Sequence, residues 1–255
     1  PMDRITFLCS RAPDPEALLA RDGARRFGAF RSHAINPVTR LPDDLGVSLA
    51  GGAWREVLEP DRRRWPATWV TLERIKYLCS DGHRLLKFDG LGRYGAEVLR
   101  RAERLHREGF GPKPRDEGGG FLSYPFLPGP LFSAADLGED EIRRLAAYCA
   151  LRASVFSAPS ADTAELTAMV RHNSAMALGV ELGASFRLDI ERPVIVDGKM
   201  MPHEWRRAKS GELLKVDGVT HGDDHFFPGP TDIAWDIAGA IVEWEMPRDA
   251  RGMFL

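Results

Sequence analysis

The chain has 255 residues, of which 44% are hydrophobic and 28% are charged, and its formal net charge is −2. This composition excludes disordered and collagen-like chains, and the lack of net positive charge argues against a nucleic-acid partner. No charge-free apolar stretch approaches the roughly 18 residues that a membrane helix needs, and the three cysteines lack metal-ligand spacing. We therefore expect a reduced, cytoplasmic protein without a membrane partner, built as one domain of two lobes or as two small domains.

The N-terminal part, residues 1–66, shows few strong signals. Residues 5–9 favour a strand, and residues 15–27 favour a helix opened by Asp14. Residues 32–66 are rich in Pro, Gly and Asp and end in three consecutive arginines. We interpret residues 1–66 as an extension of unknown role that ends in a solvated connector.

A hairpin follows. Residues 69–78 alternate between apolar and polar side chains, residues 80–83 have turn composition, and residues 84–88 favour the returning strand. Lys87 lies inside this second apolar strand. Because an unpaired buried ammonium group is costly, Lys87 needs either an anionic partner or an exposed edge.

Three helices are predicted downstream of the hairpin. The first, residues 93–108, has one apolar face and ends at Gly109. The others cover residues 139–156 and 163–182, the latter opened by a box-like Asp162-x-x-Glu165.

Two carboxylates stand at element ends near the C-terminus. Asp217 ends a short apolar strand, Leu-Leu-Lys-Val-Asp-Gly, and Asp232 starts an apolar helix, Asp-Ile-Ala-Trp-Asp-Ile-Ala-Gly. This arrangement suits a cation held beside bound phosphates.

The order of a strand with Lys87, a helix with glutamates, and a Leu-Pro-Gly turn at residues 127–129 resembles the aminoglycoside phosphotransferase and choline kinase superfamily. The resemblance implies an α+β fold of the protein-kinase-like type. A small antiparallel sheet lobe, residues 67–127, would bind the nucleotide, and a mainly helical large lobe, residues 128–255, would carry the catalytic and metal loops.

The resemblance also implies roles for single residues. Lys87 would contact the ATP phosphates, and Glu103, or alternatively Glu97, would form its ion pair. Asp217 would bind Mg²⁺. Asp236 would brace the catalytic loop from the helix that follows.

The catalytic loop departs from the family pattern H-G-D-x-x-P-x-N. Aligned on Pro202, the chain has Asp197 in place of the His, Lys199 in place of the catalytic Asp, and Glu204 in place of the metal-binding Asn. Glu204 still offers oxygen to Mg²⁺, and Lys199 can stabilise charge on a transferred phosphoryl group. The base is then either Asp197 in a shifted register or absent.

The sequence therefore predicts ATP/Mg²⁺-dependent phosphoryl transfer to the hydroxyl group of an unknown small-molecule acceptor. One alternative is a pseudokinase-type module that binds nucleotide without transfer. The other is a metal-dependent hydrolase that uses His221, Asp223 and His225.

Overall fold

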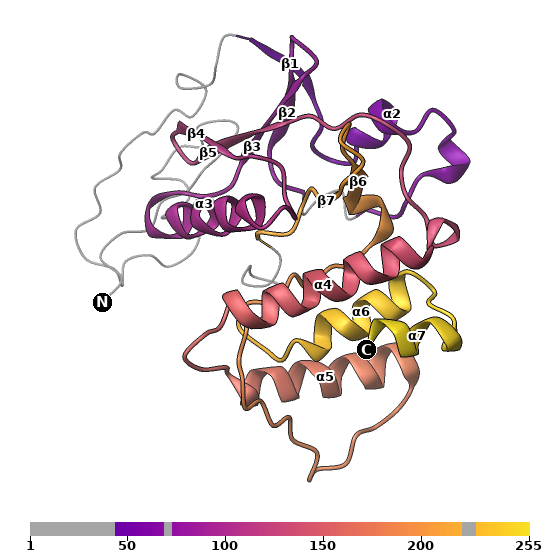
Figure 1. Cartoon of the computed structure of the whole chain (residues 1–255). Helices are drawn as coiled ribbons and strands as arrows, with labels where there is room; N and C mark the ends of the chain where they lie inside the picture. Colours follow the sequence, from indigo (N-terminus) through magenta and orange to yellow (C-terminus); the bar gives the residue numbers. More distant parts are fainter. Residues whose placement is uncertain (1–43, 69–72, 221–227) are drawn as a thin grey trace, which may run out of the picture. The chain divides into compact units, whose positions relative to one another are not determined.

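The computed structural model describes residues 44–68, 73–220 and 228–255 (Figure 1). By internal contacts the chain divides into residues 1–45 and 46–255, and the account below concerns the second unit. The strand and helix predicted at residues 5–9 and 15–27 lie outside the described residues. Within those residues, no helix is both long enough and apolar enough to cross a membrane.

The sheet has five strands in the order β1-β2-β3-β5-β4. Its strands are β1 (Leu45–Ser48), β2 (Lys76–Cys79), β3 (Arg84–Phe88), β4 (Arg115–Gly118) and β5 (Phe121–Pro125). The pairs β2–β3, β3–β5 and β4–β5 are all antiparallel. The predicted hairpin is confirmed, with β3 at the predicted bounds and β2 shorter than expected. The edge strand β1 and a short helix, α2 (Trp54–Leu58), both fall within residues 1–66, where the sequence signal was weak.

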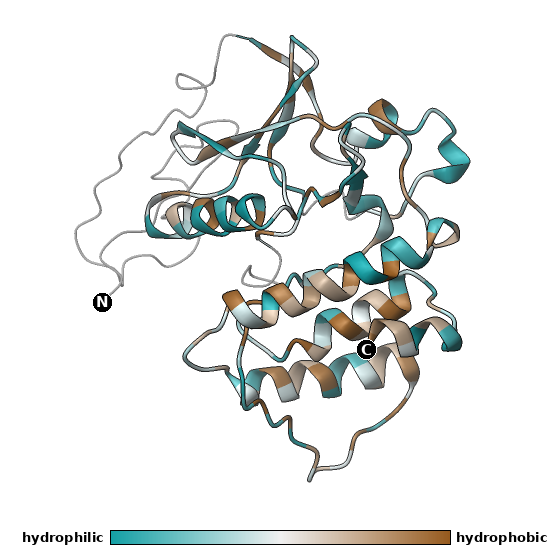
Figure 2. Ribbon diagram, viewed as in Figure 1, coloured by the Kyte–Doolittle hydropathy of each residue, from teal (hydrophilic) through white to brown (hydrophobic). Residues whose placement is uncertain are grey.

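Helix α3 (Gly92–Arg107) packs on the sheet. Val98 and Ala102 of α3 form a cluster with Leu122 and Tyr124 of β5. Figure 2 shows hydrophilic and hydrophobic segments alternating along α3, as its apolar stripe requires. Lys87 is the cross-strand partner of Leu122, so its side chain lies on the same face of the sheet as α3.

The helical part contains four further α-helices: α4 (Glu139–Val155), α5 (Thr163–Leu178), α6 (Ala234–Glu243) and α7 (Arg248–Phe254). The predicted N-cap of α5 is confirmed, since the Asp162 side chain accepts from the backbone N–H of Glu165 at 3.0 Å. The helix ends earlier than predicted, because Gly179 adopts a left-handed conformation with φ of 63°.

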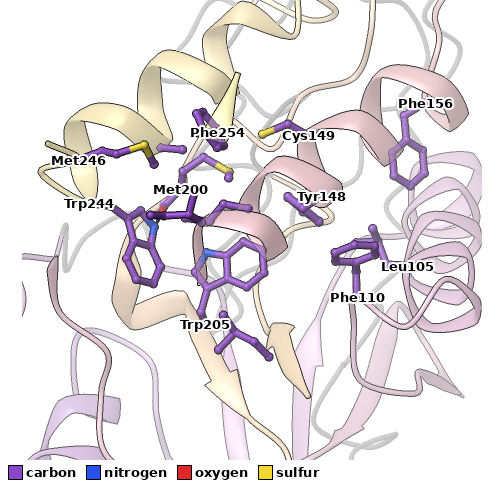
Figure 3. Packing of buried hydrophobic residues seen from close by; sticks show 14 residues of the cluster. Leu105, Phe110, Tyr148, Cys149, Phe156, Met200, Trp205, Trp244, Met246 and Phe254 are labelled. Carbon is purple, nitrogen blue, oxygen red and sulfur yellow. Dashed lines mark hydrogen bonds between the residues drawn. The ribbon is translucent and has the colours of Figure 1, made fainter. Parts of the chain in front are cut away.

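A hydrophobic core joins these helices to the hairpin of β6 (Trp205–Arg207) and β7 (Leu213–Lys215). Figure 3 shows Trp205 and Trp244 packed round Met200, with Tyr148 of α4 close by. The ring of Tyr148 meets Trp205 edge to face at a centroid distance of 5.1 Å. The same core includes Leu105 and Phe110 and so reaches the end of α3. The architecture is the expected α+β arrangement of an antiparallel sheet lobe and a mainly helical lobe.

Candidate functional site

Lys87 makes a direct link between the sheet and the chain segment after β7. Its Nζ lies 2.6 Å from Oδ1 of Asp217 and 3.4 Å from Oδ1 of Asp89. Of the two options predicted for Lys87, an anionic partner or an exposed edge, the structure shows the first. The Lys87 side chain is only 7% exposed, whereas that of Asp217 is 28% exposed, so the carboxylate is the member of the pair that solvent reaches more easily.

Electrostatics keep Lys87 charged. Burial alone would lower its pKa, but the carboxylates of Asp217 and Asp89 outweigh this effect and raise the pKa above its ordinary value. Asp89 in turn accepts a hydrogen bond from the Tyr124 hydroxyl at 2.9 Å. A cavity of about 10 Å³ lies beside Lys87 and is also lined by Lys215 and Gly218. This volume suffices for about one water molecule.

The expected ion pair of Lys87 with a helix glutamate is not found in this geometry. Glu103 is exposed on α3, and Glu97 lies 3.8 Å from Arg100 at the surface. The face of α3 that meets the sheet instead carries Val98 and Ala102. Asp217 and Asp89 neutralise the ammonium group of Lys87. The predicted ion pair with a glutamate of the helix is therefore replaced by ion pairs with these two aspartates.

Residues 197–204 form the loop that corresponds to the predicted catalytic loop. Asp236, at the start of α6, accepts the backbone N–H groups of Asp197 and Gly198 at 2.8 and 2.9 Å. This contact confirms that Asp236 braces the loop. Burial raises the pKa of Asp236, while Arg152, at 3.7 Å, favours its charged form.

Asp197 is fully buried. Its Oδ2 accepts the Tyr148 hydroxyl at 2.6 Å, and its Oδ1 lies 3.3 Å from Nζ of Lys215. Arg152 supports the same group, because its guanidinium donates to the Tyr148 hydroxyl and to the backbone oxygen of Gly218. The carboxylate is therefore held inside the protein, where an acceptor hydroxyl does not reach it in this conformation.

Lys199 and Lys215 both contact Glu204. Nζ of Lys199 lies 2.6 Å from Oε1, and Nζ of Lys215 lies 2.6 Å from Oε2. Lys199 is 39% exposed and Lys215 is fully buried. Burial would lower the pKa of each lysine, but neighbouring carboxylates raise both values above normal. The two ammonium groups are thus charged at neutral pH.

The predicted Mg²⁺ ligands were Glu204 and Asp217. Both oxygens of Glu204 and Oδ1 of Asp217 lie 2.6 Å from lysine ammonium groups. Mg²⁺ needs oxygens at about 2.0–2.1 Å in near-octahedral geometry, and an ammonium group in hydrogen-bond contact blocks that approach. The donor set in this conformation does not fit a divalent metal. Within the described residues there is also no group of three His, Cys, Asp or Glu side chains suited to a metal.

The rival hydrolase cluster of His221, Asp223 and His225 lies outside the described residues, so it stays a hypothesis. Sequence reasoning missed four members of the site, Asp89, Lys215, Tyr148 and Arg152. Lys215 carried a usable signal, because it is an isolated lysine in an apolar strand, as Lys87 is. Tyr148 and Arg152 lie one helical turn apart on α4 and gave no such signal.

No family model and no curated protein matches this chain. Solved structures with a similar fold include choline kinase LicA from Streptococcus pneumoniae, with 15% identity, a TM-score of 0.43, and coverage of 71% of this chain and 69% of that one. A choline/ethanolamine kinase family protein from Mesorhizobium loti has 16% identity and a TM-score of 0.45, covering 71% and 64%. Macrolide 2′-phosphotransferase MphH from Brachybacterium faecium has 15% identity and a TM-score of 0.45, covering 79% and 78%.

The identities are 16% or lower and the TM-scores are 0.45 or lower, so the likeness concerns the fold alone and carries no conclusion about the activity of this chain.

Proposed function

We propose that this chain binds a nucleoside triphosphate such as ATP and transfers its terminal phosphoryl group to the hydroxyl of a small molecule. The observation that carries the proposal is the contact of Lys87 Nζ with Asp217 Oδ1 at 2.6 Å. It joins a sheet strand to the segment after β7, across 130 residues of sequence. A charged lysine held at such a junction is what positioning of a polyphosphate requires.

The site offers two cations to a bound phosphate chain. Lys87 is fixed by two aspartates, and Lys199 is partly exposed near the start of the loop of residues 197–204. Phosphoryl transfer passes through a loose transition state in which positioning and charge neutralisation supply most of the rate. Lys199 would therefore assist transfer by stabilising negative charge, even though it cannot accept a proton while charged. The proposed transfer does not use Mg²⁺ bound at Glu204, because both Glu204 oxygens are engaged by lysines.

Calorimetry with ATP tests the binding step. Lys87→Ala removes one charge-assisted contact and should weaken ATP binding by about ten- to hundredfold. Lys209→Ala is the matched control, since Lys209 is exposed in the turn between β6 and β7. Equal ATP affinity in the wild type and in Lys87→Ala would contradict the proposal. A phosphate-transfer assay with a panel of small hydroxyl compounds then tests catalysis.

A second candidate is a module that binds nucleotide without transferring phosphate. It is favoured by the burial of Asp197, which leaves the loop without a carboxylate that reaches a hydroxyl. Lys199→Asp separates the two candidates, because it places a carboxylate where the family keeps its base. A gain of transfer activity in this variant, from a wild type that binds ATP without transfer, supports the second candidate. Loss of an existing activity supports the first.

A further inference from the structure

The buried ammonium of Lys215 lies among carboxylates at the centre of the site. Its Nζ is 2.6 Å from Glu204 Oε2, 2.6 Å from the backbone oxygen of Asp217, and 3.3 Å from Asp197 Oδ1. Oδ2 of Asp197 also lies at 3.3 Å, so four oxygen atoms from three residues surround an ammonium group that has three N–H donors. Lys215 thus binds oxygen atoms from three separate residues in the way that a small cation does.

The fold fixes the position of this side chain. Lys215 pairs with Trp205 in the β6–β7 hairpin, and its backbone N–H donates to the backbone oxygen of Phe110 at 2.8 Å. The aliphatic stem packs beside Gly218, where an added Cβ would lie 3.0 Å from Lys215 Cγ. The backbone pairing and the fully buried stem thus hold the ammonium group beside the carboxylates.

Charges within the cluster already balance. Glu204 contacts Lys199 and Lys215, Asp217 contacts Lys87, and Asp197 and Asp236 share the guanidinium of Arg152. Asp89 also contacts Lys87. Burial alone would lower the pKa of Arg74, but its guanidinium lies close enough to Asp89 and Asp217 for their charges to help raise that pKa. Among the described residues, five cationic side chains thus face five carboxylates, and a divalent ion added to this cluster would find no excess negative charge there to neutralise.

We propose that Lys215 serves as a built-in cation in the place of a divalent metal ion at Glu204, and that the site takes its nucleotide as the metal-free species. This inference rests on the nucleotide binding proposed above. Glu204 then acts as a positioning residue that holds Lys199 and Lys215, and the cationic partners of the phosphates are Lys87 and Lys199. A cation attached to the chain cannot dissociate, so chelators should leave the site intact.

The first experiment measures ATP affinity of the wild type by calorimetry, once with excess EDTA and once with excess Mg²⁺. We expect ATP to bind at least as tightly in EDTA as in excess Mg²⁺, because most of the ATP in the second buffer is the Mg²⁺ complex and not the metal-free species. ATP that binds only with Mg²⁺ would overturn this inference and leave the proposed function standing. ATP that binds in neither buffer would contradict the proposed function, and the second experiment then decides whether Lys215 occupies a cation position.

The second experiment removes the internal cation. Lys215→Ala leaves Asp197 and Glu204 facing a space next to the small cavity. The midpoint temperature of thermal denaturation of this variant should therefore rise when Mg²⁺ is added. The wild type and the control Lys209→Ala, which changes an exposed lysine in the same hairpin, should show no such shift. A folded Lys215→Ala that ignores Mg²⁺, Mn²⁺ and Ca²⁺ would overturn the inference. Should the variant fail to fold, the chelator comparison on the wild type decides.

Discussion

The side chains around residue 218 leave no room for a Cβ atom, so this position requires glycine. A Cβ at this position would lie 2.5 Å from Tyr148 Oη and 2.8 Å from Asp197 Oδ2, both too close for real contacts. The backbone oxygen of Gly218 also accepts from Arg152 at 2.7 Å. The absence of a side chain thus allows the buried network to close round Asp197.

Gly218→Ala should lower the free energy of unfolding by about 1–3 kcal/mol, because the new methyl group overpacks the network. Chemical denaturation measures the change. Gly252→Ala is the control, since Gly252 lies within α7 and an added Cβ there meets nothing within 4 Å. Gly252→Ala should raise the free energy of unfolding by roughly 0.5–1 kcal/mol, because alanine favours a helical backbone more than glycine does. Equal stability of Gly218→Ala and the wild type would contradict the packing argument.

Glu243, the last residue of α6, has its pKa raised from 4.5 to about 7, chiefly by burial. A carboxyl group whose pKa is higher in the folded state favours folding at low pH, and this contribution is lost as pH rises through the folded value. Stability from this group should therefore fall between about pH 4.5 and pH 7.

Glu243→Gln removes this titration and tests it. The difference in unfolding free energy between variant and wild type should grow in favour of the variant as pH rises across that window. His203, whose pKa is lowered to about 4 mainly by burial, acts in the opposite direction in both proteins, so it cancels in the difference. A difference that stays constant with pH would refute the assignment.

Among the elements, β6 holds the segment that connects the sheet to the helices. The guanidinium of Arg206 donates to the backbone oxygens of Leu127, Gly129 and Pro130 at 3.2, 2.9 and 2.9 Å. Arg206 is only 3% exposed. Three carbonyl groups without their own strand partners are thus satisfied by a single fork of N–H donors.

Arg206→Lys should destabilise the protein by about 1–3 kcal/mol, because an ammonium group cannot reproduce the planar fork and leaves carbonyls unsatisfied. Hydrogen exchange of the backbone amides in residues 126–131 should also be faster in Arg206→Lys than in the wild type. Arg115→Lys, at an exposed position on β4, is the control and should change neither quantity. Unchanged exchange in Arg206→Lys would show that the contact does not hold the linker.

Elements also show where sequence patterns suffice. The periodicity of residues 84–88 and 139–156 predicted β3 and α4 closely, because both elements bury one regular face. The strands β4 and β1 were missed. β4 has the sequence Arg-Asp-Glu-Gly, which carries no apolar alternation, and it becomes a strand only through pairing with β5.

For the molecule as a whole, the Lys87–Asp217 pair connects segments that are far apart in sequence. Its energetic coupling is measurable with a double-mutant cycle of Lys87→Met and Asp217→Asn. Because the pair is largely buried, we expect a coupling energy of about 0.5–3 kcal/mol in chemical denaturation.

The surface pair of Arg143 and Glu139 on α4 is the matched comparison, with both side chains more than half exposed. Its coupling should be only about 0.3–0.5 kcal/mol. Additive effects of Lys87→Met and Asp217→Asn, at the level of the surface pair or below, would contradict the role given to the contact.

The sequence alone determined the hairpin carrying Lys87 and the main helices, because these follow from local periodicity, and the family resemblance implied the α+β class and the brace from Asp236. The sequence also predicted that Lys87 needs either an anionic partner or an exposed edge. Only the tertiary structure decided which anion, since the choice between Glu103 and Asp217 depends on the rotation of α3 and on a contact across 130 residues. The same holds for Lys215. The sequence showed its position in an apolar strand, but the three residues whose oxygens surround its ammonium group come from separate segments that only folding brings together.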